Sequence, residues 1–152
     1  MREILFRGKR EDNGEWVFGY PIYHFADCTA KRKGKCVCNH NGELIGFIAW
    51  KDQEHEYGNV QVDPSTVGQH TGLADKNGRK IFEGDIIEFV DIFNETVRGV
   101  VYWCNGAFCA DCTTPDGNES FHGIGYLPVE CAHIIGNIND NPELLKGGNE
   151  NG

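Results

Sequence analysis

Asparagine–glycine pairs divide this chain into short segments, and this feature most constrains its fold. Four pairs, at 13–14, 41–42, 77–78 and 105–106, each lie between apolar or alternating runs. Both residue types tolerate the positive φ angles that tight β-hairpin turns require. The 20 glycines among the 152 residues add further turn positions. The sequence therefore predicts many short strands joined by turns.

The segments between these turns have the two-residue periodicity of β-strands. In 96–103, for example, Val97, Gly99, Val101 and Trp103 would share one face of a strand. Strands are predicted at 2–8, 15–23, 35–40, 43–50, 60–62, 86–90, 96–103, 107–112 and 132–138, with further strand residues around the 77–78 turn. About nine or ten strands without a long amphipathic helix predict an all-β, mainly antiparallel sandwich or barrel.

Helix is expected only as single turns. Asp63-Pro64 is predicted to open a turn or one helical turn, and Asn141-Pro142 to start a short terminal helix at 142–145. The length indicates a single domain over 1–146. Residues 147–152 contain no apolar side chain, so we expect a disordered tail there.

The chain contains no apolar run of about 18 residues, and its N-terminus lacks the apolar core of a secretory signal. We therefore expect a cytoplasmic protein in which the seven cysteines are reduced thiols.

The net charge of −9 argues against general nucleic-acid binding, because phosphates would be repelled. The one basic cluster, Lys31-Arg32-Lys33 with Lys35, is interpreted as a solvated loop, although it could contact phosphate or an acidic partner. If they are exposed, Trp16, Tyr20, Trp50 or Trp103 could stack on bases.

A zinc site is one candidate for chemistry. Cys36, Cys38 and His40 would share one strand face, and Cys109 with Cys112 could supply a second ligand pair. The C-x-C spacing is not that of a usual zinc knuckle, and Cys109 and Cys112 would face opposite sides of a regular strand. Buried structural thiols are the favoured interpretation, and no metal ligand is assigned.

A cysteine nucleophile is the other candidate. Cys131 and His133 would share a strand face, with His122 upstream. Side chains two apart on a strand are about 7 Å apart, which is too far for direct activation of a thiol by a histidine. No catalytic or cofactor-binding residue is therefore assigned, and the chain is predicted not to be an enzyme.

Two longer motifs carry a family resemblance. Residues 71–87, TGLADKNGRKIFEGDII, and residues 134–145, IIGNINDNPELL, resemble the signature segments of the YopX family of phage and prophage proteins. Phe6-Arg7-Gly8 and 16–19 are similar to the family's N-terminal hairpin. The likeness covers most of the chain apart from roughly 24–58. The departures are His70, where the family often has an aromatic residue, and the cysteine-rich segment 28–38.

The resemblance implies a β-rich N-terminal part of about 1–66 and a small SH3-like barrel over about 67–146. It also implies a phage or prophage gene, but it carries no reaction. The leading hypothesis is a non-enzymatic accessory protein that binds a phage or host protein. A nucleic-acid-associated SH3-like barrel is the alternative, followed by a Cys/His enzyme. Whether the chain forms a homo-oligomer stays open.

Overall fold

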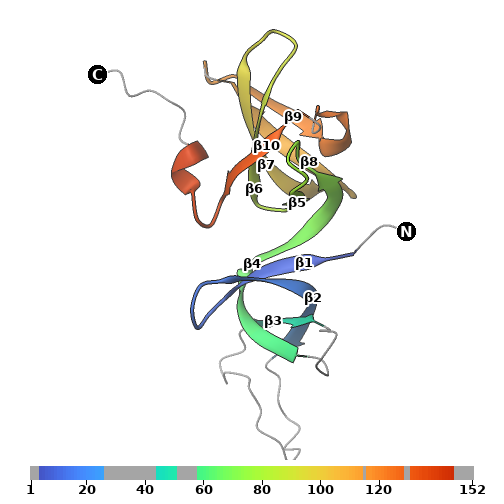
Figure 1. Ribbon diagram of the computed structural model, residues 1–152, viewed down its shortest axis with the longest axis vertical. Helices are drawn as coiled ribbons and strands as arrows, with labels where there is room; N and C mark the ends of the chain where they lie inside the picture. Colours follow the sequence, from blue (N-terminus) through green and yellow to red (C-terminus); the bar gives the residue numbers. More distant parts are fainter. Residues whose placement is uncertain (1–3, 26–43, 51–57, 115, 129–130, 146–152) are drawn as a thin grey trace, which may run out of the picture. The chain divides into compact units, whose positions relative to one another are not determined.

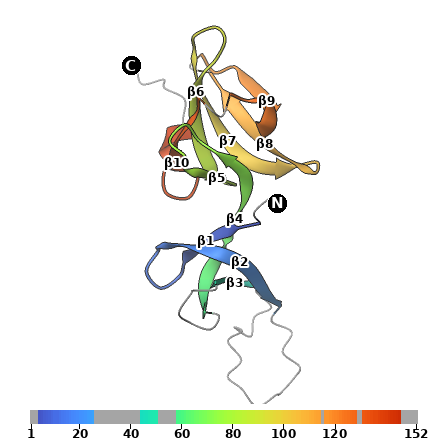
Figure 2. The same cartoon turned by 45° about the vertical axis from the view of Figure 1, so that its right-hand side comes forward.

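The computed structural model describes residues 4–25, 44–50, 58–114, 116–128 and 131–145, which form ten strands and two 3-10 helices (Figures 1 and 2). No helix in these ranges is long or apolar enough to cross a membrane. The chain divides into two compact units, one comprising Ile4–Gln69 and the other His70–Gly152 together with Met1–Glu3.

The first unit is built from antiparallel strands. They are β1 (Phe6–Arg10), β2 (Trp16–Phe25), β3 (Leu44–Trp50) and the first part of β4 (Gly58–Ala74). The order of pairing is β1-β2-β3-β4, and β1 also pairs with β4. Gly8 of β1 lies against Val62 of β4, and a Cβ atom added there would meet the valine side chain at 3.0 Å. Because glycine has no side chain, Gly8 allows β1 and β4 to approach closely.

No helical turn forms at Asp63-Pro64, because the segment belongs to β4. The predicted turn is present only as a local turn within that strand. The local bend is absorbed as a bulge, since the register of β4 against β1 shifts between Arg7 and Lys9. The Asp63 Oδ1 atom accepts a hydrogen bond from the backbone N of Ser65 at 2.9 Å. Strand β1 bonds to the same segment, because the backbone N of Lys9 donates to Thr66 Oγ1 at 2.8 Å.

The second unit contains an open five-stranded antiparallel sheet in the order β10-β6-β7-β8-β9. Its elements are β6 (Asp85–Val90), β7 (Thr96–Cys104), β8 (Ala107–Thr113), β9 (Glu119–Gly123) and β10 (His133–Asn137), and the unit also holds β5 (Lys80–Phe82) and the 3-10 helices η1 (Ile124–Tyr126) and η2 (Pro142–Leu145). The end of β4 pairs with β5 across the 77–78 turn, as that motif predicts.

The hydrophobic core of this unit lies on one face of the sheet, which we call the core face. It consists of Ile81, Ile87, Phe89, Val97, Val101, Phe108, Ala110, Cys112, Ile124, Leu127, Ala132 and Ile134, with Leu73 packed against it. Val97, Gly99 and Val101 alternate along β7 as predicted and are buried, but Trp103 is half exposed. The opposite face, which carries Arg98 and Tyr102 of β7, is called the outer face.

The all-β antiparallel prediction is confirmed, and so is its turn chemistry. Asn105 and Gly106 have φ angles of 50° and 84° and join β7 directly to β8 as a two-residue hairpin. The predicted terminal helix at 142–145 forms as a 3-10 turn. The closed SH3-like barrel expected over 67–146 is not found among the described residues, because β9 and β10 end the sheet separately.

A candidate protein-binding surface

Strand β9 forms an edge of the C-terminal sheet (Figure 1). It pairs with β8 on one side, from Thr113 opposite Glu119 to Cys109 opposite Gly123. Its first four residues are exposed and the fifth is intermediate. A strand in this position directs a row of backbone N–H and C=O groups away from the sheet, where another chain can pair with them.

The other edge strand, β10, is covered by the turn that follows β4. The backbone N of Ile134 donates to Asp75 Oδ2 at 3.1 Å, and Arg79 Nη1 donates to the Ile134 carbonyl at 3.2 Å. The backbone N of Lys76 donates to the carbonyl of Ala132 at 2.9 Å. These bonds satisfy backbone groups of β10 and of the residue before it that would otherwise face away from the sheet.

Asp75 organises this covered edge. Its Oδ1 atom also accepts hydrogen bonds from the backbone N of Asn77 at 2.8 Å and of Arg79 at 2.9 Å. Burial by itself would raise the pKa of Asp75, but the backbone donors of Ile134, Arg79 and Asn77 bring it below its ordinary value. The carboxylate therefore stays ionised at neutral pH, and this part of the 71–87 motif has a structural role.

A row of polar side chains, most of them ionisable, crosses the outer face. His133, Glu88, Arg98, Thr113 and Glu119 are successive cross-strand neighbours from β10 to β9. Arg98 Nε contacts Glu88 Oε2 at 2.9 Å, and His133 Nε2 lies 3.5 Å from Glu88 Oε1. At the β9 end, Glu119 makes no ion pair with any described residue. The charge on the outer face is therefore compensated near β10 and uncompensated near β9.

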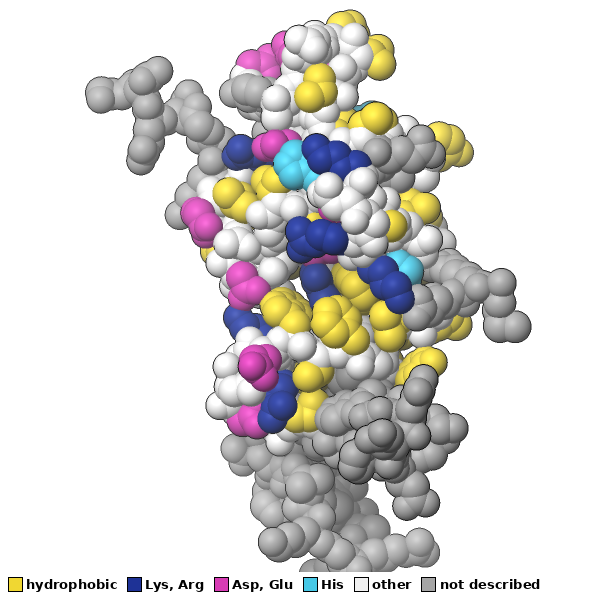
Figure 3. Space-filling model, viewed as in Figure 1, with side chains coloured by type: hydrophobic (Ala, Val, Ile, Leu, Met, Phe, Trp, Pro, Cys, Tyr) yellow, Lys and Arg dark blue, Asp and Glu magenta, His cyan; other side chains and the backbone are white. Residues whose placement is uncertain are grey.

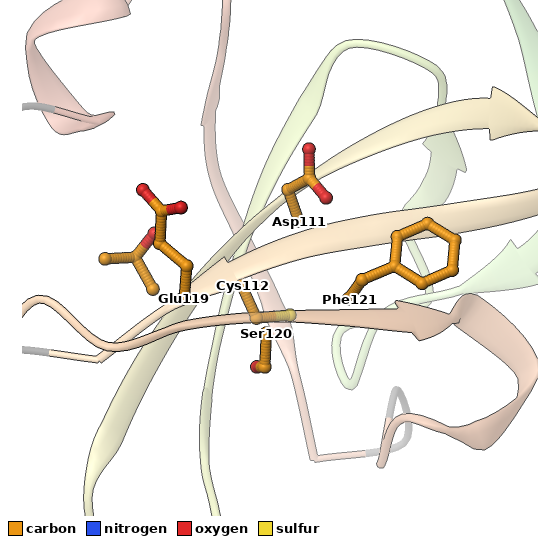
Figure 4. A pocket seen from close by; sticks show the side chains of 6 residues that line it. Asp111, Cys112, Glu119, Ser120 and Phe121 are labelled. Carbon is orange, nitrogen blue, oxygen red and sulfur yellow. The ribbon is translucent and has the colours of Figure 1, made fainter.

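A shallow pocket of about 310 Å³ lies at the β8–β9 pair (Figure 4). Its lining residues are Asp111, Cys112, Thr113, Glu119, Ser120 and Phe121. The register places Asp111 opposite Phe121 and Thr113 opposite Glu119 on the outer face. Figure 4 shows the Asp111 and Glu119 carboxyl groups rising from the same side of the two strands. The pocket thus combines two acidic groups with an aromatic ring.

Tyr102 supports this pocket from β7. Its hydroxyl donates to Asp111 Oδ1 at 2.8 Å, and its ring centroid lies 6.2 Å from that of Phe121. Desolvation, followed by the hydrogen bond to Asp111, raises the pKa of Tyr102 to about 12. The phenol therefore remains a hydrogen-bond donor that fixes the Asp111 carboxylate, while Phe121 keeps 55% of its surface exposed.

The thiols of β8 point away from one another. Cys109 lies opposite Tyr102 and Cys112 opposite Gly99, so they belong to different faces of the sheet. Desolvation raises the pKa of both thiols, that of Cys112 to about 11. Cys36, Cys38 and His40 lie outside the described residues. Within the described ranges, no group of three or more His, Cys, Asp or Glu side chains is arranged to hold a metal ion.

The Cys131–His133 pair does not have the predicted strand geometry. β10 begins at His133, so Cys131 lies in the preceding turn, where it is exposed. His133 is directed toward Glu88, and His122 lies on β9, away from both. The predicted strand at 132–138 was one residue too long at each end.

The other predicted contact residues are divided between the units. The basic cluster at 31–35 and the Trp50 side chain lie outside what the structure describes. Tyr20 on β2 and Trp103 on β7 are both at least half exposed. The Trp103 ring packs edge-on against Phe108 with centroids 4.8 Å apart, which orients it without burying it.

Sequence reasoning missed β9, the strand that forms this surface. Its sequence, ESFHG, contains one apolar side chain, so it has no amphipathic alternation. The available signal was Asp116-Gly117, where Gly117 has a φ angle of 87° and closes the β8–β9 turn. An Asp-Gly pair after a predicted strand indicates a hairpin partner even when the second strand is polar.

Comparison with known proteins places the chain in a family. A solved structure, that of protein EF1440 from Enterococcus faecalis, has 20% sequence identity and a TM-score of 0.48, and the match covers 96% of this chain and 100% of that one. No curated protein sequence matches the chain. The sequence profile described as YopX protein matches residues 5–146, and the chain therefore belongs to the YopX family.

Proposed function

We propose that this chain is a non-enzymatic protein-interaction module that binds an extended segment of a partner protein at the β9 edge. The observation that carries the proposal is the difference in pairing between the two edges of one sheet. β10 is covered by hydrogen bonds from the 75–79 turn, whereas β9 is exposed beside a pocket. Addition of a strand to an open edge is a common mode of peptide recognition.

The proposed setting is the cytoplasm of a bacterial host, with the chain encoded by a phage or prophage. Membership of the YopX family supports this setting. The partner would then be a phage protein or a host protein. Because the cytoplasm is a reducing compartment that keeps cysteines as thiols, the exposed Cys131 would not form a stable disulfide there.

The proposal of a non-enzymatic role is supported by the state of the β8 cysteines. Only a thiolate is a competent nucleophile, and the raised pKa values of Cys109 and Cys112 keep both groups protonated near neutral pH. Buried, neutral thiols of this kind behave as small apolar side chains.

Nucleic-acid binding receives less support from the charges on the surface. Asp111 and Glu119 would repel a phosphate backbone at the pocket. On the face drawn in Figure 3, the basic side chains of the described residues are interspersed with acidic ones. Tyr20 and Trp103 are exposed aromatic side chains that could stack on bases, and the experiment below therefore includes nuclease treatment.

Site-specific photocrosslinking in phage-infected or lysogenic cells tests the proposal. A photoreactive amino acid replaces Ser120 on β9, and the matched control carries it at Glu95 in the β6–β7 turn, which is also exposed. We expect a protein adduct of one defined mass from position 120 only, lost when Phe121→Glu is added. An adduct that disappears with nuclease, or equal adducts from both positions, would contradict the proposal.

A further inference from the structure

We infer that the β9 edge selects an extended peptide with a basic side chain two residues away from an aromatic or large apolar one. The inference rests on the proposed function and adds the chemistry of the partner. It uses three features of the described residues: the register of β8 and β9, the uncompensated carboxylates beside the edge, and the exposed ring of Phe121.

The register determines which side chains a bound strand would meet. Rows of outer-face side chains already run across the sheet, with Thr113 next to Glu119 and Asp111 next to Phe121. A peptide paired with β9 would extend each row by one position. Because alternate residues of a strand share a face, the positions beside Glu119 and Phe121 are two residues apart in the peptide.

The charge at the first of these positions favours a basic side chain. Glu119 makes no ion pair with any described residue, in contrast with Glu88 in the same row, which contacts Arg98. Asp111 adds a second carboxylate to the pocket, where it accepts a hydrogen bond from Tyr102. Lysine or arginine next to Glu119 would form an opposite-charge cross-strand pair, and an acidic residue there would be repelled.

The second position favours an aromatic or large apolar side chain. Phe121 is half exposed, and the Tyr102 ring packs near it on the side toward β7. On its other side, toward the open edge, the sheet has no further strand to contact the ring. An apolar side chain placed there would bury ring surface of Phe121 and continue the aromatic row. Aromatic cross-strand pairs are among the more stabilising contacts of a sheet.

The residue between these two positions would lie on the other face. There it would be a neighbour of Ser120, which is exposed and polar. A small polar residue such as threonine suits this position, because it has high strand propensity and requires no apolar cover. The complete pattern is therefore basic, small polar, aromatic along β9 from Glu119 to Phe121. In the peptide it runs from the N- to the C-terminus if the added strand is parallel to β9, and in the reverse order if it is antiparallel.

A palindromic peptide tests the inference without knowledge of strand direction. The probe is the end-blocked heptapeptide TKTFTKT, titrated into the full-length protein while backbone amide shifts are followed by NMR. We expect the largest shifts at 119–123. The comparison peptides are TQTFTQT and TETFTET, and a TKTFTKT analogue with methylated backbone nitrogens tests strand pairing.

The expected order of affinity is TKTFTKT, then TQTFTQT, then TETFTET, with about a fivefold step between neighbours, as a single cross-strand charge pair provides. Glu119→Gln should remove the first step, and the matched variant Glu95→Gln should keep it. Equal binding of TKTFTKT and TQTFTQT at 119–123 would overturn the inference and leave the proposed function intact. Failure of all the peptides to bind at 119–123, or binding of the methylated analogue as tightly as TKTFTKT, would overturn both.

A second copy of the chain is a competing occupant of the same edge. Analytical ultracentrifugation distinguishes it, because an edge-to-edge dimer would be concentration-dependent and would dissociate in the Phe121→Glu variant. We expect a monomer whose sedimentation is unchanged by that substitution. A dimer that this variant dissociates would overturn the inference.

Discussion

The two edges of the C-terminal sheet differ in how their backbone groups are satisfied. At β10, Asp75 and Arg79 bond to the N–H and the carbonyl of Ile134. At β9, four of the five residues are exposed. The nearby carboxylates of Asp111 and Glu119 form no ion pair with any described residue, whereas Glu88 near β10 does. An unprotected edge is a hazard for a folded protein, because it can pair with other chains. Protection of one edge and exposure of the other is the difference on which the proposed binding role of β9 rests.

The comparison also separates two kinds of sequence motif. The 71–87 motif, which lies within the segment matched by the family profile, contains the groups that cover β10. The segment 119–123 has no distinctive pattern, and it forms the open edge. A segment that binds a partner must carry side chains suited to that partner, whereas a turn that covers an edge must satisfy fixed backbone geometry. Substitutions on the two sides should therefore affect different properties.

Replacement of Asp75 by alanine should have the largest effect on stability. The change leaves the backbone N–H groups of Ile134, Arg79 and Asn77 without their acceptor, and that of Ile134 is buried. Hydrogen bonds to a charged acceptor are worth about 1.5–3 kcal/mol each, with incomplete additivity. We expect the free energy of unfolding, measured by urea denaturation, to fall by roughly 3 kcal/mol or more. A loss below about 1 kcal/mol would show that β10 does not depend on this carboxylate.

The same carboxylate should make stability depend on pH. The pKa of Asp75 in the folded protein lies below its ordinary value, so its ionised form stabilises the fold above the unfolded-state pKa of about 3.9. That contribution should be lost as the pH falls through the folded-state pKa. Urea denaturation of the wild type and of Asp75→Asn at several pH values checks this. The stability difference should be largest near neutral pH and shrink in acid, and a constant difference would contradict the assignment.

Gly136, on β10, provides a second test of how the covered edge is packed. A Cβ atom at this position would lie 2.5 Å from Asn141 Oδ1 and 2.9 Å from Asn141 Cβ. Gly136→Ala should therefore displace the turn that follows β10 and cost about 1–3 kcal/mol, the usual range for overpacking. Gly125→Ala is the matched control, because a Cβ atom there meets nothing within 4 Å. Equal stability of the two variants, measured by thermal unfolding, would contradict this account of β10.

The sequence predicted those parts of the fold that local chemistry determines. The turn at Asn105-Gly106 and the buried alternation of Val97 and Val101 follow from φ preference and periodicity. The failures arose where distant residues decide the outcome. β4 passes through Asp63-Pro64 because β1 pairs with it across a bulge. The polar strand β9 forms because it pairs with β8, and no property of 119–123 alone indicates this.

The candidate site was missed for the same reason. The sequence directed attention to residues with familiar chemistry, such as Cys109, Cys112 and His133, and the structure separates them. The surface at β9 depends on Glu119 and Phe121 being placed in register with Asp111 and Thr113. Register is a property of strand pairing, so the residues of 119–123 taken alone do not reveal it; only the Asp116-Gly117 turn carries a signal for it.

Phe121→Ser should have the smallest effect on stability and the most informative one on function. The ring is 55% exposed, is absent from the core cluster, and has the Tyr102 ring 6.2 Å away. Surface substitutions of this kind usually change the free energy of unfolding by less than about 0.5 kcal/mol. At the same time the variant removes the apolar surface that the proposed peptide would cover. We expect urea denaturation close to that of the wild type, together with at least a fivefold weaker interaction with TKTFTKT, measured as loss of amide shifts at 119–123.

The covered edge provides the reciprocal variant, since Gly136→Ala should lower stability and leave peptide affinity unchanged under conditions where the protein remains folded. If Phe121→Ser instead destabilised the protein by more than about 2 kcal/mol, β9 would be part of the folding core, and the distinction between a covered structural edge and an open binding edge would fail.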